Sequence, residues 1–147
     1  MKKSSVFIVI GFLIIAIIIF KPFRSEPPTP KISAAETEIS TTQGSYCWDG
    51  FLFAQCVDTI HTTPFDMTEA HTPTKVSKNE EIEIEFPIGY QPKTLRLEQW
   101  VDENTSNIIE INDEKIKAPN ESGRYVYHVR ADWNQGDGNY AFLIEVE

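Results

Sequence analysis

Apolar and acidic residues alternate strictly from Glu81 to Phe86, in the order Glu-Ile-Glu-Ile-Glu-Phe. A period of two places Ile82, Ile84 and Phe86 on one face of an extended strand and the glutamates on the other. No stretch after residue 40 shows the 3.6-residue period of an amphipathic helix, and only residues 65–71 could form a brief helical turn. The alternation therefore predicts a domain built from half-buried strands.

Turn-forming residues divide this part of the chain at short intervals. Pro87-Ile88-Gly89, Asn112-Asp113 and Gln135–Gly138 are typical of loops between strands. The spacing predicts about seven to eight strands, which is typical of an all-β, immunoglobulin-like antiparallel β-sandwich. We expect these strands near residues 41–47, 51–57, 74–78, 81–86, 94–101, 108–117, 124–133 and 139–146.

The segment Val6–Phe20 has no polar or charged side chain, and basic residues flank it on both sides. A helix that is apolar all round suits lipid better than the core of a small domain. The run therefore predicts an N-terminal transmembrane anchor over residues 1–23, with a cleaved signal peptide as the alternative. Both interpretations leave the N-terminus in the cytoplasm and place the C-terminal domain outside the cell membrane.

Prolines cluster directly after the apolar run, at positions 22, 27, 28 and 30. Proline at this density favours extended, polyproline-like chain. We therefore expect an extracytoplasmic linker over residues 24–40 and a single folded domain over residues 41–147.

The predicted domain is strongly acidic. The whole chain carries a formal charge of −9, from 13 basic and 22 acidic residues. Residues 1–40 hold five of the basic and three of the acidic residues, so residues 41–147 carry a net charge of −11. Such a domain repels nucleic-acid phosphates, whose binding depends on lysine and arginine. The expected partners are the lipid bilayer, through the N-terminal helix, and an envelope protein, with no nucleic acid.

Cys47 and Cys56 are the two cysteines of the chain, and they flank a turn signal at Asp49-Gly50. In an exported domain, an even pair at close spacing predicts a structural disulfide. Free thiols remain the alternative. The pair lacks the Cys-x-x-Cys spacing of zinc sites, so no metal is expected.

The C-terminal stretch Gly123–Val146 resembles the closing hairpin of bacterial immunoglobulin-like modules. The segment Thr41–Trp48, together with Cys56-Val57-Asp58, is similar to small exported or lipoprotein-like proteins of Bacillus-type bacteria. The resemblance covers the whole domain and implies an exported sandwich, but no activity. This chain departs from the lipoprotein members because it has no cysteine placed for lipidation.

Other residues with functional potential are scattered. Trp48, Trp100 and Trp133 are candidate interaction residues, although tryptophans of such a domain more often belong to its core and rim. The segment Asp132–Gly138 resembles the start of a calcium loop, but its glycine spacing favours a tight hairpin.

No nucleophile–base motif or phosphate-binding loop occurs in the sequence. We therefore expect no enzyme, no cofactor and no catalytic residue. The sequence favours a membrane-anchored binding or interaction module of the cell envelope, with a ligand that the sequence does not identify. A proteinase-inhibitor-like domain is the alternative, and a hydrolase or redox enzyme is a third hypothesis.

Overall fold

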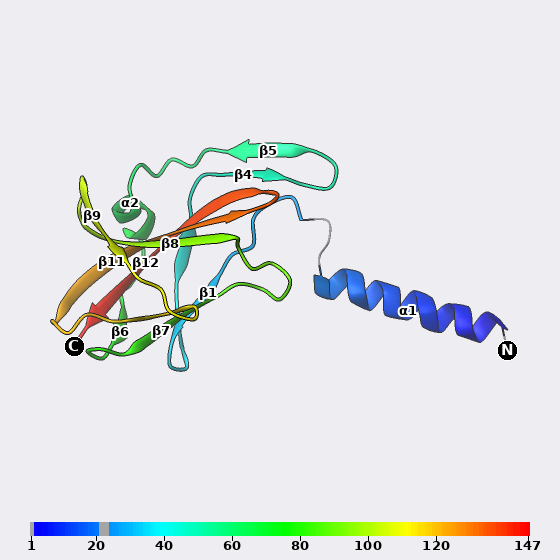
Figure 1. Cartoon of the computed structure of the whole chain (residues 1–147), viewed down its shortest axis with the longest axis horizontal. Coiled ribbons are helices and arrows are strands. Elements are labelled where there is room, and N and C mark those ends of the chain that lie inside the picture. The colour runs from blue at the N-terminus through cyan, green and yellow to red at the C-terminus, as the bar shows by residue number, and fades with distance from the viewer. Residues whose placement is uncertain (1, 21–23) are drawn as a thin grey trace.

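The computed structural model describes residues 2–20 and 24–147, and the side chains of residues 6–18 and 24–147. Helix α1 (Lys2–Phe20) lies to one side of a β-rich domain (Figure 1). Its described apolar side chains are largely exposed, including Phe7 and Phe12 at 73% and 71%. Residue 1 and residues 21–23 of the predicted anchor lie outside the described residues. Over the described part of the chain, no helix combines the length and the hydropathy that a membrane crossing requires.

The domain contains many more strands than the seven to eight expected. They form two sheets, a four-stranded sheet in the order β10-β7-β1-β2 and an eight-stranded sheet built around β5-β4-β12-β11-β8-β9, with β3 and β6 also paired to β12. The strands are β1 (Lys31–Ala34), β2 (Thr37–Ile39), β3 (Thr41–Gln43), β4 (Tyr46–Asp49), β5 (Ala54–Val57), β6 (Thr74–Val76), β7 (Glu81–Glu85), β8 (Thr94–Asp102), β9 (Thr105–Ile109), β10 (Lys115–Lys117), β11 (Gly123–Trp133) and β12 (Gly136–Val146).

The two sheets share one apolar core, so the predicted all-β sandwich is confirmed at this level. The four-stranded sheet contributes Ile82 and Ile84, both fully buried, as the alternation in β7 predicted. The eight-stranded sheet contributes Tyr140, Phe142 and Ile144, all fully buried on one face of β12. All strand pairs are antiparallel except β6 with β12.

The predicted linker over residues 24–40 is wrong in its second half, and the domain begins before residue 41. Strands β1 and β2 form an antiparallel pair, and β1 also pairs with β7. Ile32 lies between Ile39 and Ile84 in the register and is completely buried. Pro28 is also fixed, because its carbonyl accepts a 2.7 Å hydrogen bond from the buried Tyr140 hydroxyl. These residues complete the four-stranded sheet and therefore belong to the core.

Two further strand predictions need correction. The strand expected at residues 108–117 is two strands, β9 and β10, because a turn at Asp113 and Glu114 with positive φ angles separates them. The strand expected at residues 94–101 does not keep its alternation to the end, because Val101 is 57% exposed. It adjoins a register shift between Trp100 and Asp102, which disrupts the alternation there.

The short helix α2 (Pro64–Thr68) confirms the brief helical turn expected nearby. Thr63 caps its N-terminus, accepting a hydrogen bond from the Asp66 amide, while the Asp66 carboxylate accepts one from the Thr63 amide. The helix packs on the outer face of the eight-stranded sheet, over β11 and β12 (Figure 1). As a result Val126 and His128, which point away from the core, are nevertheless buried.

Candidate functional site

A groove of about 820 Å³ lies on the outer face of the eight-stranded sheet, opposite the core. Strands β8, β11 and β12 form its floor, and the chain around β4 and β5 forms one wall. Its polar lining residues are Ser45, Asp58, Thr94, Arg96, His128, Arg130, Asp132, Asp137 and Asn139.

The strand register arranges the charged side chains of the groove in rows. Arg96 on β8 lies directly opposite Arg130 on β11. In the next row, Asp132 on β11 lies directly opposite Asp137 on β12. Like charges in directly opposed positions of a sheet repel each other. The groove floor therefore places a pair of cations beside a pair of anions. Within each pair, the two like charges repel each other.

Few of these charges are neutralised by protein groups. Arg96 lies 3.9 Å from the Glu98 carboxylate, at the outer limit of an ion pair. Within residues 24–147, Arg130, Asp132 and Asp137 form no ion pair and no side-chain hydrogen bond. All three side chains are exposed to the groove and to solvent. They are therefore available to a ligand without the loss of an internal contact.

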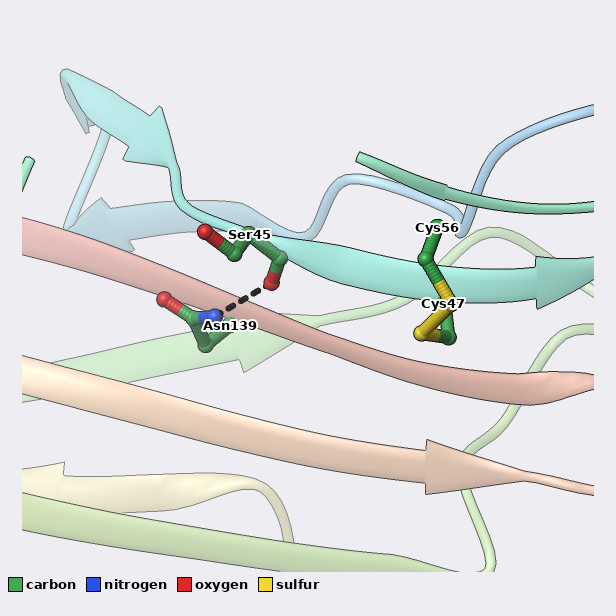
Figure 2. Close-up of a disulfide and its surroundings, with 4 residues drawn as sticks. All are labelled: Ser45, Cys47, Cys56 and Asn139. Atoms are coloured by element: carbon green, nitrogen blue, oxygen red, sulfur yellow. Dashed lines mark hydrogen bonds between the residues drawn. A yellow bond between two sulfur atoms is a disulfide. The ribbon is translucent and has the colours of Figure 1, made fainter. Parts of the chain in front are cut away.

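A hydrogen-bonded chain links the groove floor to its wall. The Nε2 of His128 donates to Asn139 Oδ1 at 3.1 Å. Asn139 Nδ2 in turn donates to the Ser45 carbonyl at 2.5 Å (Figure 2). Gly44 permits this approach, because a Cβ at that position would clash with the Asn139 amide. These two hydrogen bonds tie β11 and β12 to the segment that leads into β4.

Among the described residues that line the groove, His128 is the one ionisable side chain that is buried. Burial lowers the pKa of its imidazole, with a smaller lowering from the Arg130 charge, while Asn139 and Glu98 oppose the shift. The neutral ring donates through Nε2, so Nδ1 is an acceptor. That Nδ1 is buried and has no hydrogen-bond partner within the described chain. A buried acceptor without a partner is costly unless a water or ligand satisfies it.

The wall of the groove contains the disulfide predicted from the sequence. Cys47 and Cys56 are bonded and are register partners in the β4–β5 hairpin (Figure 2). Cys47 itself lines the groove. The prediction of a disulfide is therefore confirmed, and the thiols are not free.

Of the three candidate interaction tryptophans, Trp48 and Trp133 lie in the core, as tryptophans of such a domain more often do. Trp48 and Trp133 are only 3% and 9% exposed, and their rings meet edge to face in the core at 5.5 Å. Trp100 is half-buried, between the Phe65 ring at 6.4 Å and the His128 ring at 6.3 Å. The three residues cannot present a shared exposed platform, because they lie on opposite faces of the sheet.

The segment Asp132–Gly138 is a tight hairpin, as its glycine spacing favoured. Trp133 pairs with Gly136, leaving two residues in the turn between β11 and β12. Gly136 has a φ of 149°, and a Cβ there would clash with the Cys47 carbonyl. Over the described residues, no three acidic, histidine or cysteine side chains are grouped as a metal site would need.

Sequence reasoning did not identify the arginines and the histidine of the groove. His128 and Arg130 lie close together on β11, but Arg96 is distant in the chain, and only the pairing of β8 with β11 brings it beside them. The sequence did contain one indication of the groove: two arginines lie at outward-facing positions of alternating strands, which is unusual in an acidic domain.

Comparison with known proteins provides no family assignment for this arrangement. No protein-family model matches the chain, and no significant match was found among the curated proteins or the solved structures.

Proposed function

We propose that this chain is a membrane-attached, extracytoplasmic binding module of the cell envelope, and that it binds its ligand in the groove. The sandwich is proposed to be of the immunoglobulin-like kind, with the groove on its larger sheet. The observation that carries the proposal is the opposed pair Arg96 and Arg130, whose row on the outer face of the sheet is next to that of His128.

The arginine pair favours a ligand with a carboxylate. Two guanidinium groups on neighbouring strands repel each other unless an anion lies between them, and guanidinium matches a carboxylate in a bidentate geometry. Arg130 has no protein partner within residues 24–147, so a carboxylate would remove this repulsion without breaking an ion pair.

The aspartate pair favours a ligand that also carries a positive charge. Asp132 and Asp137 lie one row from the arginines on the same face. A ligand with separated acidic and basic groups would satisfy both rows. Peptides have this chemistry, and they also offer the N–H donors that the groove can accept. We therefore assign the ligand to the peptide class.

A catalytic role has less support from the same geometry. Cys47 is held in the disulfide, and the Ser45 hydroxyl accepts a 3.0 Å hydrogen bond from the Thr59 amide. The His128 Nε2 is hydrogen-bonded to the Asn139 amide oxygen. A nucleophilic hydroxyl would need this nitrogen as the base that takes its proton. These contacts support a binding role over the hydrolase or redox hypothesis.

The test is peptide binding to the full chain in nonionic detergent, measured by calorimetry with short peptides of mixed charge. Each peptide is compared with a version whose C-terminal carboxylate is an amide. R130Q should weaken binding about tenfold or more, since a hydrogen bond to a charged group contributes about 1.5–3 kcal/mol. R124Q is the matched control, because Arg124 is exposed on β11 but pairs with Glu145 outside the groove. Equal effects of R130Q and R124Q would contradict the proposal.

The membrane attachment is proposed to occur through α1. From Val6 to Ile18, large apolar side chains are exposed around the helix, and the described domain does not cover them. The extracytoplasmic location is supported by the disulfide, since such bonds persist in oxidising compartments. In intact cells, a membrane-impermeant thiol reagent should label Cys47 and Cys56 only after reduction. Labelling that requires cell lysis would contradict the proposed location.

A further inference from the structure

The turn of the β4–β5 hairpin exposes three consecutive large apolar side chains. Phe51, Leu52 and Phe53 are 71%, 81% and 60% exposed. Elsewhere in residues 24–147, exposed large apolar side chains occur singly along the sequence, which is normal for a protein surface. The turn residues from Gly50 to Gln55 carry no charge in a domain that is otherwise strongly acidic.

The same turn is packed against the segment that follows α1. Gln55 Nε2 donates a 2.6 Å hydrogen bond to the Ser25 carbonyl. Gly50 lies so close to Arg24 that a Cβ on it would come within 3.1 Å of the Arg24 carbonyl. With the turn, Arg24 and Ser25 enclose a hollow of about 310 Å³ that is lined mainly by apolar atoms.

Chain geometry keeps this turn close to the end of α1. Helix α1 ends at Phe20, and four residues of chain to Arg24 can span at most about 14 Å. Figure 1 shows the β4–β5 turn at the end of the domain nearest α1. The Arg24 guanidinium also lies 5.2 Å from the centre of the Tyr90 ring, which places a positive charge at this end of the acidic domain.

We propose that the Phe51–Phe53 turn inserts into the surface of the lipid bilayer beside α1. This inference rests on the proposed membrane attachment through α1. Apolar side chains at the turn enter the acyl region, and Arg24 lies at the level of the anionic headgroups. The disulfide at the base of the hairpin keeps the two strands together, so that the turn acts as a second, rigid contact. The domain is thereby held against the membrane in one orientation.

The test uses the full chain reconstituted into vesicles of phosphatidylcholine and phosphatidylglycerol, with and without bromine on the acyl chains. L52W introduces a tryptophan at the turn, and bromine quenches tryptophan emission in the acyl region. I60W is the matched control, because Ile60 is 94% exposed on the connection from β5 to α2, which leads away from α1 (Figure 1). Wild-type protein measures the constant background from Trp48, Trp100 and Trp133.

Each outcome separates this proposal from the proposed attachment. The inference is supported if the protein floats with the vesicles and bromine quenches L52W more than wild type, while I60W is quenched no more than wild type. If the protein floats but both variants respond like wild type, the turn proposal is overturned and attachment through α1 stands. A blue shift of L52W emission without bromine quenching shows that protein covers the turn instead of lipid, which also overturns it. Failure to float with the vesicles overturns both proposals.

Discussion

Ile32 provides the sharpest test of the fold, because the sequence pattern and the structure give opposite expectations for it. As part of an extended linker, Ile32 would tolerate substitution by alanine within about 0.5 kcal/mol. In the structure it is fully buried in β1, with Ile39 and Ile84 as its register partners on either side. Strands on both sides restrict collapse around the deleted atoms. Since burial is complete, I32A should lower the free energy of unfolding by about 3–4 kcal/mol, within the range for Ile→Ala in cores.

The assay is urea unfolding of the full chain in nonionic detergent, followed by tryptophan fluorescence. Trp48 and Trp133 lie in the core and therefore report its loss. With a urea dependence of about 2 kcal/mol per molar, I32A should lower the midpoint by about 1.5–2 M. K31A is the control on the same strand, because Lys31 is exposed and should change stability by less than about 0.5 kcal/mol. A midpoint for I32A equal to that of K31A would show that β1 does not complete the core.

Three other predictions concern the disulfide, the buried histidine and the β11–β12 turn. Replacing Cys47 and Cys56 together by alanine should lower the free energy of unfolding by about 2.7 kcal/mol, from the loop entropy of ten residues, and reductant should then have no further effect on the melting temperature. Because burial lowers the folded-state pKa of His128, its stabilising contribution is complete above pH 6.5 and is lost as pH falls through that folded pKa; H128Q should flatten the fall in melting temperature on acidification, whereas H61Q should not. G136A should cost about 2 kcal/mol or more in urea unfolding, because a Cβ clashes with the Cys47 carbonyl and φ is 149°; unchanged stability would contradict the hairpin geometry.

The long strands could be predicted from the sequence because their side chains are in two different environments. In β7 and β12, one face meets the core and the other meets solvent or a partly polar surface, so the alternation is visible. β1 and β2 are only four and three residues long, which is too short to display a period. The prolines before them suggested an extended linker. Proline does favour extended chain, but here that chain supplies a strand to the sheet.

The candidate groove depends on register, which alternation alone does not provide. A shift of one residue between β8 and β11 would move Arg96 and Arg130 away from each other and onto different faces. The disulfide was predictable because it joins residues close in sequence, across a single turn. The groove joins four strands from both halves of the domain, so its composition follows only from the complete pairing of the sheet.

The β4–β5 hairpin connects the two proposed surfaces. Cys47, at its base, lines the groove, while the turn at Phe51–Phe53 lies beside Arg24 at the end nearest α1. Contact of the turn with the bilayer would therefore fix the orientation of the groove wall relative to the membrane. The ligand would then be bound close to the membrane surface, where an envelope peptide could be presented to the groove. Loss of the disulfide should weaken both functions together, because β4 and β5 carry the turn and the chain around them also forms a wall of the groove, whereas R130Q should weaken ligand binding alone.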